Sequence, residues 1–234
     1  MRVTGAKRNP NLSNFVVSNT TGGKPTIHNV FIVDASGSMG GSKYDNAISG
    51  LNELIKSIKS DVDSENTLTI VEFEGHSVTT RLKTTKDIPE IYHGMGTGGM
   101  TPLNKAVGET IEEIVLLRAK KYNVSDKILV NVFTDGGENS SHGSKYANSK
   151  FLGNYIKKLE DESVTVTFIG TEEEVAYATQ DLKLNISNTL VHDNSALGVM
   201  DAFNTTVLAR TAYSKSVASG EDVKIDFYTK VMVK

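Results

Sequence analysis

The chain has 234 residues, of which 38% are hydrophobic and 23% are charged, and its formal net charge is −3. This length fits one large domain, or one domain with small additions, and allows a sizeable buried core. The absence of cysteine excludes disulfides, thiolate catalysis and cysteine-ligated zinc or iron–sulfur sites. No basic cluster marks the chain as a binder of nucleic acid or of a membrane surface, and no apolar run approaches the ~20 residues of a membrane span.

The sequence predicts three regions. Residues 1–27 are polar, and we expect an irregular N-terminal arm in which only residues 15–17 resemble a strand. Residues 28–212 form the main domain. Residues 213–234 form a C-terminal extension, in which alternating apolar and polar residues from 222 onward predict an added strand.

Strands and helices alternate through the main domain. Short apolar runs predict strands at 30–33, 67–75, 77–83, 127–135, 164–170 and 188–193. Apolar residues at helical spacing predict helices at 43–59, 102–121, 149–160, 172–182 and 196–211. This alternation is typical of a doubly wound, Rossmann-like α/β fold, a mainly parallel sheet with helices on both faces. Such sheets bind ligands at the carboxyl ends of their strands, where the strand order reverses.

A group of oxygen-bearing side chains follows the first of these strands. Asp34 ends the strand, and Ser36 and Ser38 come next at alternate positions among glycines. Alternate residues of an extended chain point to the same side, so the three side chains should converge. One carboxylate with two hydroxyls suits Mg²⁺, Mn²⁺ or Ca²⁺ better than zinc. The simpler alternative is that the two serines shape a turn and cap the next helix.

Two further oxygen-bearing residues occupy matching positions. Asp135 ends another apolar strand, and Thr101 precedes a helix after a run of glycines. Each has an ordinary structural interpretation, as a turn residue and as a helix N-cap. Five such residues at related positions favour one joint site. Glu138 and Asn139 follow closely, and they could hold water around a metal or cap their loop.

These motifs resemble the metal-ion-dependent adhesion site of the von Willebrand factor A (VWA) domain family. The similarity rests on Asp34-Ala-Ser36-Gly-Ser38, on Thr101 before Pro102-Leu103, and on Thr134-Asp135-Gly136. It covers roughly residues 28–212, and two departures are Met100 before Thr101 and the second glycine after Asp135. The segments FTDGGENSS and VTVTFIGT resemble in particular the small stand-alone members of bacteria and their phages.

The resemblance implies a fold, a ligand set and a function. The family's fold is a six-stranded, mostly parallel sheet with one antiparallel edge strand. Its motif assigns the metal to Asp34, Ser36, Ser38, Thr101 and Asp135, with Mg²⁺, or Mn²⁺ or Ca²⁺, as the cofactor. A partner protein would supply an acidic residue to the metal, so we expect a metal-dependent protein-interaction module and not an enzyme.

Two other functions stay open at this point. One is a structural or virion assembly component, because strand-like arms can pair with neighbouring chains. The other is a metal-dependent hydrolase, for which Glu138 is the one visible candidate base. The glycines between 94 and 99 also match a dinucleotide-binding pattern, but they lack the preceding strand that such a site needs. We expect a cytoplasmic protein, or a virion protein if a phage encodes it, while the partner and the oligomeric state are not indicated.

Overall fold

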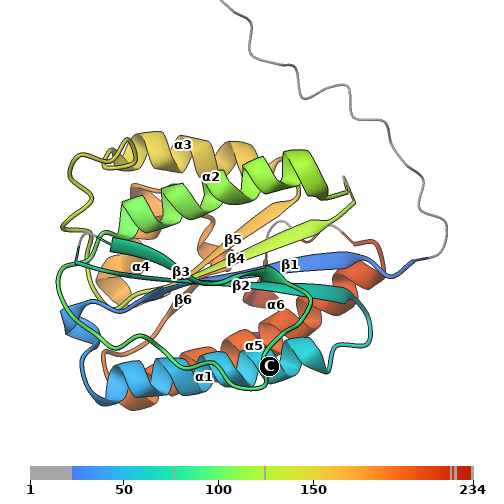
Figure 1. The fold of residues 1–234 in the computed structure, drawn as a ribbon, viewed down its shortest axis with the longest axis horizontal. Coiled ribbons are helices and arrows are strands. Elements are labelled where there is room, and N and C mark those ends of the chain that lie inside the picture. The colour runs from blue at the N-terminus through green and yellow to red at the C-terminus, as the bar shows by residue number, and fades with distance from the viewer. Residues whose placement is uncertain (1–22, 76, 124, 222, 224–225, 233–234) are drawn as a thin grey trace, which may run out of the picture.

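Six strands form one sheet in the order β3-β2-β1-β4-β5-β6 (Figure 1). A computed structural model describes residues 23–232 apart from 76, 124, 222 and 224–225, so the expected strand at 15–17 lies outside the described residues. The strands are β1 (Thr26–Asp34), β2 (Glu65–Glu74), β3 (Ser77–Thr85), β4 (Lys127–Phe133), β5 (Val164–Gly170) and β6 (Thr189–Val191). Only β3 runs antiparallel to its neighbour β2, while the other four pairs are parallel. The expected α/β class, with one antiparallel edge strand, is confirmed.

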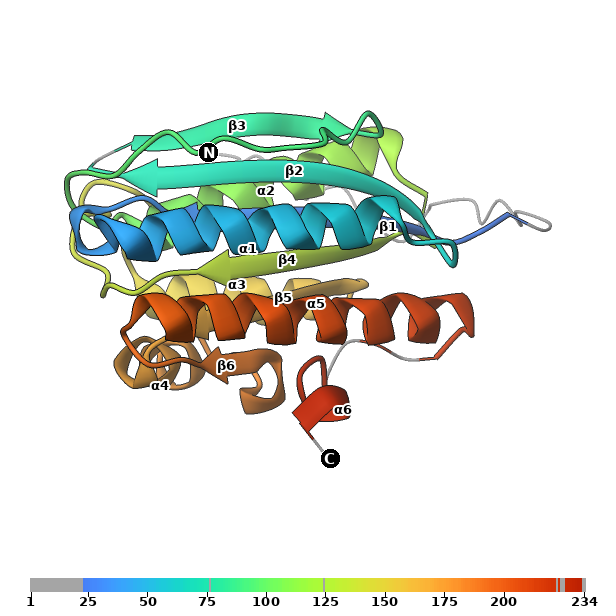
Figure 2. The same cartoon turned by 90° about the horizontal axis from the view of Figure 1, so that it is seen from below.

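Helices cover both faces of this sheet. They are α1 (Ser42–Lys59), α2 (Leu103–Lys121), α3 (Ser149–Glu160), α4 (Glu172–Gln180), α5 (Ala196–Ala218) and the short α6 (Thr229–Met232), with 3₁₀ turns η2 (Gly37–Met39) and η3 (Ile186–Asn188). Helices α2 and α3 lie over one face and α1 and α5 over the other (Figure 1). Figure 2 shows α1 and α5 side by side in front of the strands. Within the described residues, no helix has both the length and the apolar character needed to cross a bilayer.

Strand β1 contributes to the core on both faces. Phe31 and Val33 belong to the cluster on the side of α1 and α5, while Val30 and Ile32 belong to the cluster on the side of α2 and α3. Successive side chains of a strand point to opposite faces, so a central strand covered on both faces must be apolar at every position. This requirement explains the unbroken apolar run from 30 to 33.

Strand β1 begins at Thr26, earlier than the apolar run predicts. Polar residues extend it, because their side chains find partners inside the protein. The ring of His28 bonds Thr67 Oγ1 at 2.8 Å and Asp126 Oδ2 at 3.2 Å. A buried polar group with partners is tolerated in a sheet, so a search for apolar runs misses this part of the strand.

The C-terminal tail differs from its expected strand. Helix α5 continues to Ala218, beyond the expected end at 211, because Tyr213 and Val217 keep its buried face apolar. Within the described residues of the tail, the only regular element after α5 is the α6 helix. The proposed limits of the main domain at 28 and 212 stay a prediction.

Aromatic residues hold the tail against the rest of the fold. Phe227 lies 5.7 Å from the ring of Tyr213, and the hydroxyl of Tyr228 is 3.1 Å from Thr206 Oγ1 on α5. The backbone N–H groups of both aromatic residues donate hydrogen bonds to the η3 turn. The apolar residues at 223, 225 and 227 alternate as in a strand, but Phe227 and its neighbour Tyr228 are anchors of the tail, which a periodicity argument cannot detect.

We expect Phe227→Ala to lower the free energy of unfolding by about 3–5 kcal/mol, because it leaves a cavity beneath α5. Urea denaturation of the full chain measures this change. Leu208→Ala on the exposed face of α5 is the matched control, with an expected change within about 0.5 kcal/mol. A change as small for Phe227→Ala would show that the tail is not part of the folded core.

Candidate functional site

The carboxyl ends of β1 and β4 lie next to each other at the centre of the sheet. The two strands are parallel, and Val33 pairs with Phe133 at this edge. The chain leaves β1 toward α1 on one face and leaves β4 toward α3 on the other (Figure 1). This is the reversal of strand order at which open α/β sheets bind ligands, and it places Asp34 and Asp135 beside each other.

Asp34 is the most deeply buried of the predicted ligands, with 0% of its surface exposed. Its Oδ1 accepts a 2.7 Å hydrogen bond from the Ser36 N–H, and its Oδ2 accepts one of 2.5 Å from the Thr134 hydroxyl. The pKa of Asp34 is nevertheless raised to about 6, mainly by burial, with a smaller contribution from the nearby charge of Asp135. The site therefore contains a carboxylate whose charge the protein alone does not balance.

The two serines connect Asp34 to Asp135. Ser36 Oγ lies 3.0 Å from Ser38 Oγ, and the Ser38 hydroxyl donates a 2.8 Å hydrogen bond to Asp135 Oδ1. Neither serine acts as a helix cap through its side chain. Ser36 makes no side-chain bond to η2, and the N-cap of α1 is Gly41. The capping interpretation of this motif is therefore not supported, and the serine hydroxyls face the two carboxylates.

Thr101 reaches the site on the long connection between β3 and α2. Backbone hydrogen bonds attach this connection to the β1–α1 loop, from the Gly37 N–H to Gly99 O at 3.1 Å and from the Gly98 N–H to Ala35 O at 2.9 Å. Gly99 has φ +68°, and a Cβ there would lie 2.6 Å from the backbone of Gly75. Glycine at this position allows two backbone segments to approach closely. This packing requirement explains part of the glycine run between 94 and 99, so a nucleotide site is not needed to explain it.

Residues after β4 fix Thr101 and the start of α2. The Thr101 N–H donates to Asn139 Oδ1 at 2.8 Å, and the Asn139 N–H donates back to Thr101 O at 3.1 Å. Glu138 accepts from the Asn104 N–H at 2.7 Å and so caps α2. Both residues therefore position Thr101 and its helix. Met100 does not displace Thr101, because its side chain points outward at 45% exposure while Thr101 is 3% exposed.

The oxygen atoms converge over the bare face of Gly136. A Cβ on this glycine would lie 2.9 Å from Ser38 Oγ, 3.4 Å from Thr101 Oγ1 and 3.9 Å from Asp34 Oδ2. Two separate loops thus direct oxygen atoms at one small space on a third loop, the one that carries Gly136, and any larger residue there would fill that space. This donor set is the kind that hard divalent cations prefer, so the residues present fit the predicted metal.

A metal here would depend on hydroxyls as much as on carboxylates. Within the described part of the chain, no three His, Cys, Asp or Glu side chains come together as a metal site. The candidate site has two carboxylates, Asp34 and Asp135, and its other oxygen atoms come from serine and threonine. Its occupancy by a metal stays a prediction.

A lysine that the sequence analysis missed contacts the site. The ammonium group of Lys43 forms an ion pair with Asp135 Oδ2, and it also donates a 3.0 Å hydrogen bond to Asn194 Oδ1. The side chain of Asp135 is fully buried, while that of Lys43 is 20% exposed. A lysine in the first turn of a helix opposes the helix dipole, and this irregularity was the available signal in the sequence.

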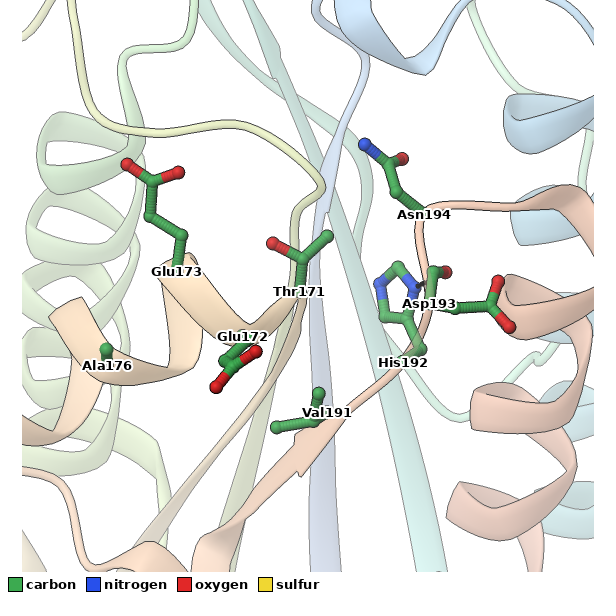
Figure 3. A pocket seen from close by; sticks show the side chains of 8 residues that line it. All are labelled: Thr171, Glu172, Glu173, Ala176, Val191, His192, Asp193 and Asn194. Carbon is green, nitrogen blue, oxygen red and sulfur yellow. Dashed lines mark hydrogen bonds between the residues drawn. The ribbon is translucent and has the colours of Figure 1, made fainter.

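A groove of about 690 Å³ lies beside the site, between the start of α4 and the connection from β6 to α5 (Figure 3). Glu172 and Glu173 line it from the helix, and His192 and Asn194 line it from the connection. Asn194 is also a hydrogen-bond partner of Lys43, so the groove is linked to the candidate site through that lysine. The sequence analysis did not identify these residues, because no motif links them to the metal ligands.

Comparison with known proteins assigns the fold. No family model matches the chain, and no curated protein matches it. The vWF domain of the type V pili tip protein Mfa5 from Porphyromonas gingivalis matches with a TM-score of 0.61 and 12% identity, over 86% of this chain and 98% of that domain. The SpRpn10 VWA domain matches with a TM-score of 0.56 and 14% identity, over 76% of this chain and 93% of that domain.

A third similar structure is described as containing a bound metal. Proximal thread matrix protein 1 from the mussel byssus, with a zinc-occupied MIDAS motif, matches with a TM-score of 0.55 and 14% identity. The match covers 80% of this chain and 46% of the mussel protein. At these identities the likeness concerns the fold alone, and the chain has a VWA-like fold.

We expect Asp34→Asn to stabilise the metal-free protein at pH 7.5. The pKa of Asp34 is about 6 in the folded protein against an ordinary value of 3.8, so its contribution to stability is complete below about pH 4 and is lost as the pH rises through about 6. The neutral amide avoids this loss of about 3 kcal/mol, which corresponds to a Tm higher by roughly 6–12 °C.

Thermal unfolding in EDTA at pH 7.5 and at pH 5 measures this effect. The gain should shrink at pH 5, where the aspartate itself becomes protonated. Asp45→Asn in the exposed first turn of α1 is the control and should not show the same gain. A lower Tm for Asp34→Asn at pH 7.5 would contradict the expectation.

We expect Lys43→Met to strengthen Mg²⁺ binding by roughly tenfold, because the ammonium group competes with the dication for Asp135 and repels it. Isothermal titration calorimetry measures the dissociation constant. Lys157 is an exposed residue of α3. The Lys157→Met variant removes the same charge on that helix and should leave the dissociation constant for Mg²⁺ unchanged. Weaker binding by Lys43→Met would show that Lys43 supports the site instead of competing for it.

Proposed function

We propose that this protein is a metal-dependent protein-interaction module. Asp34, Ser36, Ser38, Thr101 and Asp135 would hold a divalent cation, with Mg²⁺ as the first choice and Mn²⁺ or Ca²⁺ as alternatives. An acidic residue of a partner protein would complete the metal's coordination. The observation that carries this proposal is the convergence of oxygen atoms of Asp34, Ser38 and Thr101, from two loops, over Gly136 on a third loop.

The charge of the site favours an anionic partner. Two carboxylates and a divalent cation are neutral together, and Lys43 adds one positive charge beside Asp135. Five protein oxygens also leave a position open in an octahedral shell. A carboxylate from outside satisfies both the open position and the surplus positive charge, which is why we propose an acidic residue on the partner.

Structural neighbours support the proposal without deciding it. One of them is a pilus tip protein, and another is a matrix protein whose MIDAS motif is occupied by zinc. These descriptions belong to those proteins. For a chain of the same fold they favour a binding function, which is the one that we propose. The bacterial or phage origin, and the cytoplasmic or virion location, stay predictions from the sequence.

The position of Glu138 supports binding over hydrolysis. Hydrolysis would need a general base that is free to take a proton from water. Glu138 Oε1 accepts hydrogen bonds from the N–H groups of Ser140 and Ser141, and Oε2 accepts from the Asn104 N–H and the Ser141 hydroxyl. These four donors occupy both oxygens of the carboxylate, so Glu138 serves to fix its own loop and the start of α2. We therefore propose that the protein is not an enzyme.

An assembly role depends on arms that can pair with other chains. The described residues of the C-terminal arm instead pack on their own fold through Phe227 and Tyr228. The N-terminal arm up to residue 22 lies outside the described residues. We therefore keep the interaction module as the proposal, with the assembly role as the alternative.

Two neighbouring glycines provide a sharp test of the metal. Gly136→Ala places a methyl group among the proposed ligands without removing any of them, whereas a Cβ at Gly137 meets no atom within 4 Å. We expect 10 mM Mg²⁺ to raise the Tm of the unmodified protein and of Gly137→Ala, and not that of Gly136→Ala. Thermal unfolding with and without EDTA measures the shift. An equal rise in both variants would place the stabilising ion elsewhere.

Acetate can stand in for the carboxylate of the partner. Mn²⁺ bound to the dialysed protein should broaden the NMR signal of the acetate methyl group, because the acetate would occupy the open position. The Gly136→Ala variant treated in the same way should leave the signal sharp. Equal line widths in the two samples would argue against an open position that takes a carboxylate.

A further inference from the structure

We propose that the groove between α4 and the β6–α5 connection binds an arginine or lysine side chain of the partner protein. This inference rests on the proposed function and extends it, because the partner would then carry a basic residue near its metal-binding acidic residue. The groove opens at the same edge of the sheet as the candidate metal site (Figure 3).

The charge of the groove favours a cation. Glu172 and Glu173 lie exposed on the first turn of α4, and within the described residues neither has a hydrogen-bond or ion-pair partner. No described lysine or arginine lines the groove. Acidic residues in a first turn also stabilise their helix, so these two carboxylates alone do not define a site.

His192 provides the second and independent observation. It is 6% exposed, and its ring extends from the β6–α5 connection toward the α4 side of the groove (Figure 3). Its Nδ1 lies 2.7 Å from the backbone oxygen of Asp193, which can only accept, so Nδ1 carries the hydrogen. The other nitrogen, Nε2, is then an acceptor, and within the described part of the chain it is buried without a partner.

An unused acceptor across the same groove from two unpaired carboxylates favours a hydrogen-bond donor with positive charge. Guanidinium and ammonium groups have this character, since they donate several hydrogen bonds and accept none. A bound metal fits less well, because no three His, Cys, Asp or Glu side chains gather as a metal site among the described residues. The structure thus favours an organic cation.

The walls of the groove suit the rest of such a side chain. Val191 is 53% exposed and lies in the groove together with Ala176. These apolar groups can cover the methylene stem of an arginine or lysine while its charged end reaches Glu172, Glu173 and His192. Asn194 joins the groove to Lys43 and so to Asp135, which places the two proposed contacts of the partner next to each other.

NMR titration of the ¹⁵N-labelled full chain tests this inference. The probes are the N-acetyl methylamides of arginine and of lysine, and the control is the same derivative of citrulline, which has nearly the shape of arginine without its charge. We expect arginine or lysine to shift the backbone amides of residues 171–176 and 191–194, with citrulline at least tenfold weaker. Equal shifts with citrulline, or shifts elsewhere only, would overturn the proposal.

Variants connect the effect to the groove. Glu172→Gln with Glu173→Gln should weaken binding of the basic probe at least tenfold, whereas Glu109→Gln with Glu113→Gln on α2 makes the same charge change outside the groove and should not. His192→Phe keeps a ring against Phe133 and should weaken binding several-fold. Unchanged binding in the α4 double variant would overturn the proposal.

The rise of the Tm in Mg²⁺ is measured separately on the same protein samples. The groove should bind the basic probe equally well in Gly136→Ala. If Mg²⁺ raises the Tm but the probe does not bind, this inference alone is wrong. If the probe binds but Mg²⁺ does not raise the Tm, the proposed function alone is wrong.

Peptides that join aspartate to arginine through one to six glycines then test whether one partner makes both contacts. In Mg²⁺, at least one length should bind tenfold tighter than its Asp→Asn analogue. Failure at every length would show that the two contacts do not serve one ligand.

Discussion

The burial of the Asp34 carboxylate at the end of β1 is the constraint around which the site is organised. A charge without solvent must be neutralised, hydrogen-bonded or paired. Two donors, from Ser36 and Thr134, are not enough, because the pKa of Asp34 still rises to about 6. The central strand thus ends in a group that is unfavourable in the protein alone and favourable beside a cation. The surrounding loops are arranged so that a cation can be shared.

Those loops hold each other through their backbones. The connection that carries Thr101 bonds to the β1–α1 loop at Gly37, and Asn139 fixes Thr101 itself from the β4 side. Hydrogen bonds between backbone groups keep the ligands close without using the ligand side chains. The hydroxyls of Ser36 and Ser38 therefore bond inside the site, to each other and to Asp135, which is the arrangement that a preorganised binding site needs.

Much of the fold could be predicted, because its sheet is covered on both faces and its strands are unbroken apolar runs. The five proposed ligands were identified from spacing and from family resemblance, and the structure brings them to one edge. Lys43 and His192 were missed for a physical reason, since their roles arise from contacts with residues far away in the sequence. The start of β1 was missed for the same reason, because the polar residue His28 is stabilised there by its distant partners Thr67 and Asp126. The tail was misjudged because its apolar residues at 223, 225 and 227 alternate as in a strand, while Phe227 and Tyr228 serve as anchors.

The pairing of β1 with β4 also has a consequence for the order of events during folding. Ser38 and Asp135 meet across 97 residues of sequence, and Thr134 and Asp34 across 100. Contacts of such long range form late, since the chain between them must first be ordered. The aromatic anchors of the tail pack on α5 and so add to the layer that contains α1 and α5. The candidate site therefore exists only where the sheet has formed, because in an unfolded chain nothing brings these oxygen atoms together.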